Sequence, residues 1–246
     1  MARIKDQAIC IRHLDWSQTS QIVVLLGREH GKVRGVAKGA KRLSPGSIAR
    51  FSGGIELLTG GQFVAVTRPS AELATITEWD LQQPFHHLHE DLAAQQLALY
   101  GADLVNAMLI DHDPHPRVLA ALADYLQELA CRSTHGAALL HFQWTVLTEC
   151  GYRPQIDEDV VHGGALGDGP ACRFDARRGG LTRAAAAAAP GTWGVRRQTV
   201  ALLRQVAGGS FQSDADTMQR ANRLLCAYLR ALLDRQLPTM RFVLDR

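Results

Sequence analysis

The sequence predicts a mixed α+β protein, in which a small closed β-barrel at residues 1–80 precedes an all-helical domain at residues 81–246. Two observations support this fold class. Short runs rich in Val and Ile, separated by glycine-containing turns, fill the first part of the chain. After Pro84, apolar residues recur at the three- and four-residue spacing of amphipathic helices. A chain of 246 residues is long enough for one large domain or two small ones.

The barrel strands are expected where apolar runs are bounded by turn residues. A turn at His30-Gly31 divides one of these runs, and Thr59-Gly60-Gly61 divides another and predicts a hairpin. Several short strands with glycine turns are typical of a small closed barrel. The expected strand regions are residues 8–14, 21–39, 55–67 and 72–81.

Five helices are expected in the second domain. Pro114 and Pro116 precede the second helix, because proline is tolerated in a first helical turn. Ser213 with Asp216 resembles a capping box at the start of the fifth helix. The expected helical ranges are 85–109, 117–130, 136–152, 195–207 and 214–235.

An irregular, glycine-rich insertion at residues 153–193 interrupts these helices. Within it, the segment CRFDARRGGLT (172–182) predicts a short hairpin that turns at Gly179-Gly180. The alanines at 184–189, followed by Pro190-Gly191, predict about one and a half helical turns. A sequence-tolerant spacer is the alternative for this alanine run.

Composition and motifs exclude several function classes. No run of about 18 apolar residues is present, so no membrane span is expected. The N-terminus does not resemble a secretory signal, and we therefore expect a cytoplasmic protein. The sequence has no GxxxxGK[ST] loop for ATP and no GxSxG nucleophile motif. Since no catalytic constellation is identifiable, we expect neither an enzyme nor a cofactor.

A basic run at residues 28–50 is the most informative feature of the chain. Its cations stand against a single acid, Glu29, in a protein whose net charge is only +3. Glycines between the cations allow the backbone to turn or to approach a partner closely. Such a run suits a phosphate backbone, although a solvated surface is the simpler interpretation of any group of cations. The cations expected to contact phosphates are Lys32, Arg34, Lys38, Lys41, Arg42 and Arg50, and Arg173, Arg177 and Arg178 are expected to extend this track.

Several segments, in this order, resemble the RecO family of bacterial recombination mediators. The resemblance spans most of the chain, and it is most specific in the pattern WSxTS followed by a glycine- and cation-rich VAKGA(K/R) segment. The matching segments are HLDWSQTSQIVVLL (13–26), HGKVRGVAKGAKR (30–42), RFSGGIELL (50–58), ECGYRP (149–154) and RFDARRGGL (173–181).

The resemblance implies an N-terminal OB-fold followed by a helical domain. It also implies a protein that binds single- and double-stranded DNA and anneals complementary strands without a nucleotide. With RecR as partner, such a protein helps to load the recombinase on strands coated by single-stranded DNA-binding protein. A nucleoid-associated, cytoplasmic location follows from this role.

One departure from the family concerns zinc. Many relatives carry two CxxC pairs after the GY motif, whereas this chain has 5 widely spaced cysteines and no such pair. We therefore predict a zinc-free variant. Asp159, His162 and Cys172 remain as a set of three potential ligands. His86, His89 and Glu90 have ligand spacing on a helix but lack a further ligand, which favours a polar helix start.

Two further expectations concern aromatic side chains and the protein partner. Trp16 and Phe51 are candidates for stacking on bases, with burial in the barrel as the alternative. The tail of single-stranded DNA-binding proteins is acidic with an apolar end, and its receptor needs an apolar pocket beside a cation. The residues expected to form that receptor are Arg117 or Arg132 near Leu139, Leu140 or Phe142, with an ordinary helix surface as the alternative.

A function from another class stays open at this point. In it, the chain is a protein-only adaptor that holds other repair proteins together, and the basic run is plain surface. Annealing of complementary oligonucleotides by the purified protein alone separates the two hypotheses.

Overall fold

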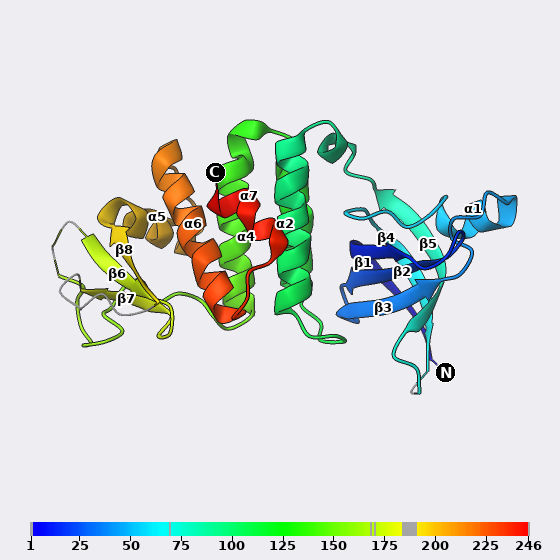
Figure 1. The fold of residues 1–246 in the computed structure, drawn as a ribbon, viewed down its shortest axis with the longest axis horizontal. Helices are drawn as coiled ribbons and strands as arrows, with labels where there is room; N and C mark the ends of the chain where they lie inside the picture. Colours follow the sequence, from blue (N-terminus) through cyan, green and yellow to red (C-terminus); the bar gives the residue numbers. More distant parts are fainter. Residues whose placement is uncertain (1, 69, 168, 170, 184–190, 246) are drawn as a thin grey trace. The chain divides into compact units, whose positions relative to one another are not determined.

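The structure, a computed structural model, describes residues 2–68, 70–167, 169, 171–183 and 191–245 (Figure 1). The chain divides into two compact units, Met1–Ala130 and Cys131–Arg246. The domain boundary expected at residue 80 falls inside a strand, β5 (Ala74–Gln83), and the helices begin after that strand ends. The first two long helices after it belong to the first unit. The expected boundary at residue 80 between a barrel domain and a helical domain therefore stays a prediction.

A closed five-stranded barrel forms the core of the first unit, in agreement with the sequence. The strand order around the barrel is β1-β2-β3-β5-β4, and β4 pairs with β1 to complete the ring. The β3–β5 pair is parallel and the other pairs are antiparallel. This arrangement is OB-like. The strands are β1 (Ala2–Asp15), β2 (Gln21–Gly27), β3 (Lys32–Ala37), β4 (Gly60–Thr67) and β5 (Ala74–Gln83).

Apolar side chains from every strand fill the barrel. Val23 and Leu25 of β2 project into the same cluster as Phe63, Ile76 and Trp79, and all five are buried. The alternation of inward and outward residues along each strand places them there. Full burial of a side chain of this size stabilises the fold by about 1.5–3 kcal/mol relative to exposure.

Two details of the barrel differ from the sequence prediction. The prediction of a hairpin at Thr59-Gly60-Gly61 is wrong, because residues 55–59 form an irregular segment, in which Leu58 has φ 62°. Gly61 is needed for close packing instead, since a Cβ there would lie 2.3 Å from the backbone oxygen of Asp80. A short helix, α1 (Pro45–Phe51), was not expected. At 7 residues it is too short to produce a clear helical period.

Helices complete the first unit. Asp91 caps α2 by accepting a hydrogen bond from the Ala93 N–H (2.8 Å), which divides the single helix expected at 85–109 into two elements. The Tyr125 hydroxyl of α3 donates to the Leu97 carbonyl of α2 (2.9 Å) and ties the two helices together. The elements are the 3₁₀ helix η1 (His86–His89), α2 (Leu92–Met108) and α3 (Pro116–Glu128).

Helices also dominate the second unit. Gln143 of α4 donates to the Asn222 side chain of α6 (2.9 Å), and both residues are buried between the two helices. Asp214, rather than the expected Ser213, caps α6 by accepting from the Thr217 N–H (2.8 Å). The elements are η2 (Arg132–Thr134), α4 (His135–Glu149), α5 (Arg197–Ala207), α6 (Ala215–Leu232), η3 (Pro238–Met240) and α7 (Arg241–Leu244).

The second unit is not all-helical, which corrects the prediction. The insertion contains a three-stranded antiparallel sheet of order β7-β6-β8. The hairpin at Gly179-Gly180 is confirmed, with Gly179 at φ 66°. The alanine run at 184–189 lies outside the described residues. The strands are β6 (Ala171–Asp175), β7 (Gly180–Arg183) and β8 (Thr192–Arg196). In the described part of the chain, no helix has the length and apolarity that a bilayer span requires.

Candidate nucleic-acid interface

A groove on the barrel brings three of the predicted cations together. It has a volume of about 380 Å³ and lies where the β1–β2 turn meets the end of β3, the loop after it and α1. Four serines contribute hydroxyls that the sequence analysis did not assign. The lining residues are Trp16, Ser17, Ser20, Val36, Lys38, Gly39, Arg42, Ser44, Ser47 and Arg50.

Backbone geometry fixes the loop that carries Lys38 and Arg42. Gly39 has φ +73°, a conformation that L-residues with side chains rarely adopt. Its N–H donates to the Ser20 hydroxyl (3.3 Å), and its carbonyl accepts a hydrogen bond from the Ser47 hydroxyl of α1. The loop is therefore held from both sides, by the β1–β2 turn and by α1.

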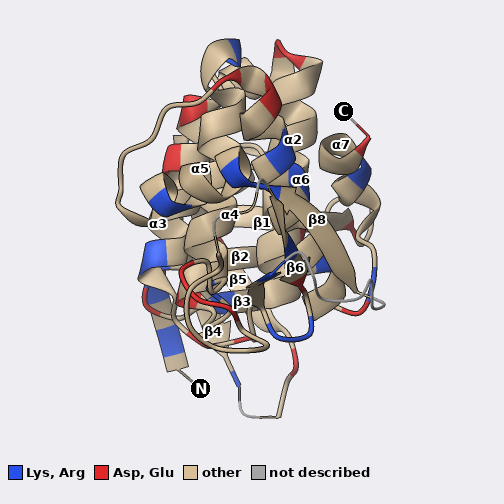
Figure 2. Ribbon diagram, turned by 90° about the vertical axis from the view of Figure 1, so that its left-hand side faces the viewer, with Lys and Arg blue, Asp and Glu red and all other residues tan. Residues whose placement is uncertain are grey.

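The groove is positive and free of acidic side chains. Within the described part of the chain, the side chains of Lys38 and Arg42 have no hydrogen-bond or ion-pair partner, and no acid lines the groove. The Nε–H of Arg50 donates to the Gly46 carbonyl (3.1 Å), and the two terminal guanidinium nitrogens take no part in this bond. Cations without partners exchange only water and counterions when they bind a phosphate. Lys and Arg are also found on many other elements (Figure 2).

Trp16 adds an exposed aromatic ring to the groove. The ring belongs to the turn after β1, and the residue is 67% exposed. The turn is closed by a hydrogen bond from the Trp16 N–H to the Ser20 carbonyl (2.9 Å). Phe51, the other stacking candidate, is buried in the barrel core and is unavailable. An exposed indole beside cations is a suitable platform for an unpaired base.

Lys32 does not belong to the groove. Its side chain is only 4% exposed, and its ammonium donates to the carbonyls of Asn106 (2.9 Å) and Leu109 (2.8 Å) and pairs with Asp111 (3.2 Å). Arg34 also pairs with Asp111, at 2.8 Å. Burial and these bonds leave the Lys32 ammonium no room for a phosphate, and we withdraw it from the interface. It ties β3 to the C-terminal end of α2.

Lys41 precedes Arg42 in the chain but does not line the groove, and its side chain is held in an exposed ion pair. Its ammonium is 2.8 Å from an Asp15 carboxylate oxygen. The hydrogen bond from Lys41 holds the pKa of the Asp15 carboxyl below its ordinary value. Because Lys41 is already paired with a carboxylate, it is a weaker candidate for a phosphate contact than Lys38 or Arg42.

The arginines expected to extend the track lie in the second unit. Arg173 donates to the Thr192 hydroxyl (2.9 Å), across the β6–β8 pair. Arg178 pairs with Asp175 (3.5 Å), whose carboxylate also accepts from the Arg177 N–H (2.9 Å) and so shapes the turn. Arg177 and Arg178 are exposed. Their continuity with the barrel groove stays a prediction.

The structure does not support the receptor that was expected around Leu139 and Phe142. Both side chains are buried in the core of the second unit, on α4. Arg132 is exposed in that unit, whereas Arg117 belongs to the first unit, where it lines a cavity of about 620 Å³ with Arg28. We therefore remove Leu139 and Phe142 from the receptor.

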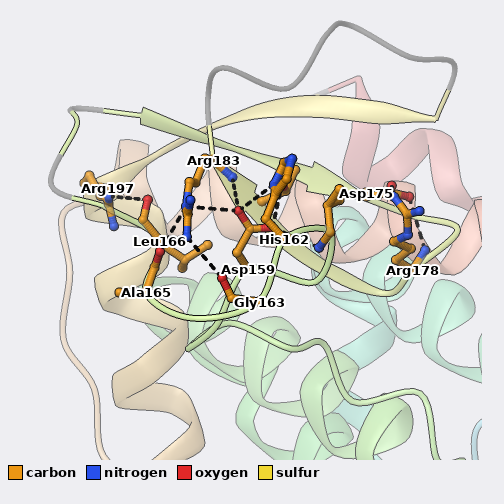
Figure 3. A network of polar contacts seen from close by, with 11 residues as sticks. Asp159, His162, Gly163, Ala165, Leu166, Asp175, Arg178, Arg183 and Arg197 are labelled. Atoms are coloured by element: carbon orange, nitrogen blue, oxygen red, sulfur yellow. Dashed lines mark hydrogen bonds and ion pairs between the residues drawn. The ribbon is translucent and has the colours of Figure 1, made fainter.

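A buried carboxylate organises the segment that contains Asp159, His162 and Cys172, the three potential zinc ligands. The side chain of Asp159 is fully buried and accepts hydrogen bonds from the Val161 N–H (2.8 Å), the Thr182 hydroxyl (2.9 Å) and the Arg183 N–H (3.2 Å). The His162 ring lies 3.2 Å from it (Figure 3). Burial raises the pKa of the Asp159 carboxyl, but the bonds from His162, Val161, Thr182 and Arg183 outweigh burial and hold it below its ordinary value.

These residues do not fit a zinc ion. The oxygens of Asp159 are already surrounded by donors, and the Cys172 thiol donates to the Val195 carbonyl (3.7 Å) in the sheet. Burial raises the pKa of this thiol, which disfavours the thiolate that zinc requires. Among the residues that the structure describes, no group of three or more His, Cys, Asp or Glu is placed to hold a metal. Hydrogen bonds to Asp159 organise this segment.

The fold and the groove define a class of protein: an OB-like barrel with a cationic, aromatic-bearing surface, continued by a helical region. Two family models match the chain, "Recombination protein O N terminal" over residues 1–85 and "Recombination protein O C terminal" over residues 89–241. The chain belongs to the RecO family of DNA repair and recombination proteins, which are mediators rather than enzymes.

Full-length relatives agree with this assignment. The DNA repair protein RecO of Anaeromyxobacter sp. (strain Fw109-5) is 32% identical over 248 residues, covering 98% of this chain and 95% of the relative. The DNA repair protein RecO of Geobacter metallireducens is 30% identical over 249 residues, covering 99% and 98%. The resemblance predicted from the sequence is confirmed.

Proposed function

We propose that this chain binds single- and double-stranded DNA in the barrel groove, anneals complementary strands and assists recombinase loading on strands coated by single-stranded DNA-binding protein. One observation carries the proposal: Lys38, Arg42 and Arg50 line one groove with an exposed Trp16 and no acid. Family membership supplies the DNA repair context.

Binding is driven by the release of counterions from phosphates, and it is largely independent of sequence. Annealing follows when the positive surface lowers the repulsion between two strands and holds them close. This is catalysis by approximation, with base pairing as the driving force. Trp16 adds a contact that only unpaired bases can accept, because the faces of paired bases are covered in a duplex.

Further parts of the proposal rest on the family and on topology. We infer that the barrel is an OB-fold, since its strand order and the parallel β3–β5 pair match that topology. RecR and the tail of single-stranded DNA-binding protein are the proposed partners, and a nucleoid-associated place in the cytoplasm fits this role.

The test is an annealing assay with complementary oligonucleotides, run with and without single-stranded DNA-binding protein. The variant Lys38→Ala/Arg42→Ala/Arg50→Ala should lose most of the acceleration. The matched control Arg3→Ala/Lys5→Ala/Arg12→Ala removes as much charge from exposed positions of β1 outside the groove and should keep it. If the unmodified protein does not accelerate annealing at all, the protein-only adaptor replaces this proposal.

A further inference from the structure

A second groove lies in the second unit, between the edge strand β8 and helix α6. Its volume is about 450 Å³. Consecutive residues of β8 form one wall, and residues spaced three and four apart on α6 form the other. Both elements are labelled in Figure 1. The lining residues are Trp193, Gly194, Val195, Arg196, Thr199, Arg220, Arg223, Leu224, Ala227, Arg230 and Leu244.

No strand in the described part of the chain pairs with the outer edge of β8. The Ala176 N–H donates to the Gly191 carbonyl (3.0 Å), one step beyond the last β6–β8 pair. Hydrogen-bonded and non-bonded pairs alternate in an antiparallel ladder. Trp193 and Val195 therefore direct their backbone groups toward β6, and Gly194 directs its N–H and carbonyl outward. A Cβ at Gly194 would meet no atom within 4 Å, so the face of the sheet is uncrowded at this residue.

Arginines surround the groove, and none of its lining residues is acidic. Arg223 is fixed by the Leu244 carbonyl (2.9 Å), and Arg220 by Asp216 (3.3 Å). Arg196 and Arg230 have no hydrogen-bond or ion-pair partner among the residues that the structure describes. The groove therefore offers two cations of fixed orientation and two that are free to take an anion.

The floor of the groove is apolar. Val195 and Leu224 are nearly buried, and Leu244 and Ala227 extend the same surface. The Trp193 ring is half-buried and stacks on Phe174, with ring centroids 6.1 Å apart and planes 6° apart. An apolar floor beneath arginines suits side chains of both kinds on one ligand.

We propose that this groove binds an extended acidic segment of a partner protein, which adds as a fourth strand to β8 and packs against α6. A groove between an edge strand and a helix is a geometry in which peptide-binding domains add a strand. Alternate residues of a strand point to opposite faces, so apolar residues reach the floor on the side of α6, while the acidic residues between them lie on the face of Arg196. Arg230 lines the groove from α6 and adds positive charge beside the floor. This inference does not depend on DNA binding by the barrel.

A peptide fits the groove better than a nucleic acid does. A DNA strand uses cations and aromatic rings but makes no use of an open strand edge. Here the edge at Gly194 lines the groove directly, and aliphatic side chains form most of the floor beside Trp193. The barrel groove shows the opposite character, since serines and cations form most of its lining.

The test uses the full chain and a fluorescent octapeptide of alternating Asp and Leu, followed by fluorescence anisotropy. Two further peptides carry N-methyl groups on either all Leu amides or all Asp amides. Successive amides of a strand point to opposite edges, so only one of the two should lose binding, by at least tenfold. An octapeptide with the same residues in two blocks should bind at least tenfold more weakly than the alternating one.

Variants of the protein complete the test. Gly194→Pro removes the outward N–H of an edge strand, where proline is tolerated. This change should lower the affinity for the alternating peptide at least tenfold, whereas Gly194→Ala should leave it unchanged. Arg196→Glu/Arg230→Glu should have a similar effect, and Arg177→Glu, an exposed arginine of the β6–β7 turn, should not. Thermal melting checks that each variant is folded.

Three results would overturn the proposal: no binding of the alternating peptide, equal loss with both methylated peptides, or binding insensitive to both Gly194→Pro and the arginine changes. If the arginine changes reduce oligonucleotide binding but leave peptide binding intact, the groove is a nucleic-acid site instead. Because all variants lie outside the barrel, failure here leaves the proposed function untouched.

Discussion

Strand β3 and the loop that follows it carry cations from the same basic run, but these cations have opposite roles. Lys32 of β3 is buried and donates to two carbonyls as it pairs with Asp111. Lys38 and Arg42, a few residues later, line an open groove, and their side chains have no partner among the residues that the structure describes. The difference shows that the partners a cation meets after folding, and not its place in a charged run, decide whether it is held within the protein or stays available for a ligand.

The largest effect is expected where a buried charge has the most partners, at Asp159. Asp159→Ala should destabilise the second unit by about 4 kcal/mol, because several buried donors lose their acceptor. Urea unfolding measures the change. A loss of less than about 1 kcal/mol would show that the buried carboxylate does not hold the segment together.

The same carboxylate predicts a pH dependence. The folded-state pKa of Asp159 lies below its ordinary value of 3.8, so its contribution is complete above that pH and is lost as pH falls toward the folded-state pKa. Asp159→Asn should therefore show a smaller loss of stability than the unmodified protein when the pH is lowered below about 4. Unfolding curves at pH 7 and in acid provide the comparison.

The next largest effect is expected for Lys32→Met. It should lower the free energy of unfolding by about 3 kcal/mol, because two carbonyls and Asp111 lose their buried partner. Arg34→Ala is the control on the same strand. Its ion pair is half-exposed and should contribute less than about 1 kcal/mol. Folded Lys32→Met should bind DNA as the unmodified protein does, and weaker binding would place Lys32 in the interface after all.

Trp16→Ala should have a moderate effect confined to single strands. Stacking of one base contributes about 1–3 kcal/mol, so single-strand affinity should fall roughly tenfold while duplex affinity and the salt dependence stay unchanged. Trp16→Phe, which keeps an aromatic face, should restore most of the affinity. Equal losses for single strands and duplex would mean that Trp16 supports the groove without stacking on bases.

The smallest effect is expected at the exposed ion pair between Asp15 and Lys41. Asp15→Asn should release Lys41 from its ion pair and raise DNA affinity about twofold at low salt, in line with the small free energy of exposed pairs. In the Lys41→Ala background the same change should raise DNA affinity by less, because no cation remains to be released. A larger gain in that background would show that Asp15 acts by repelling the phosphates.

The sequence predicted the parts of the fold that have a clear period. The barrel strands and the long helices follow from alternating or helical apolar patterns. Helix α1 was missed because it spans only 7 residues, and β8, with 5 residues, lacks the paired glycines that mark the β6–β7 hairpin. Lys32 and Lys38 look alike in sequence. They differ only because Lys32 meets carbonyls more than 70 residues away, and such distant partners cannot be read from a local pattern.

The candidate site was predicted in part. The sequence pointed separately to Lys38, Arg42 and Arg50 and to Trp16 as a stacking candidate. Closure of the barrel brings them together with the serines of the β1–β2 turn, and no local pattern shows that convergence. The groove between β8 and α6 was not expected at all. Its arginines are scattered between residues 196 and 230 and come together only through tertiary folding.

A salt titration of single-strand binding tests the central contrast between paired and unpaired cations most directly. For Lys38→Ala/Arg42→Ala/Arg50→Ala, the slope of log K against log salt should become shallower by about two, since each phosphate contact contributes about 0.7 for single strands. Lys32→Met, compared under conditions where it is folded, should leave the slope unchanged. A triple variant with an unchanged slope, or a Lys32 variant whose slope falls as far, would contradict the assignment of the groove as the DNA interface.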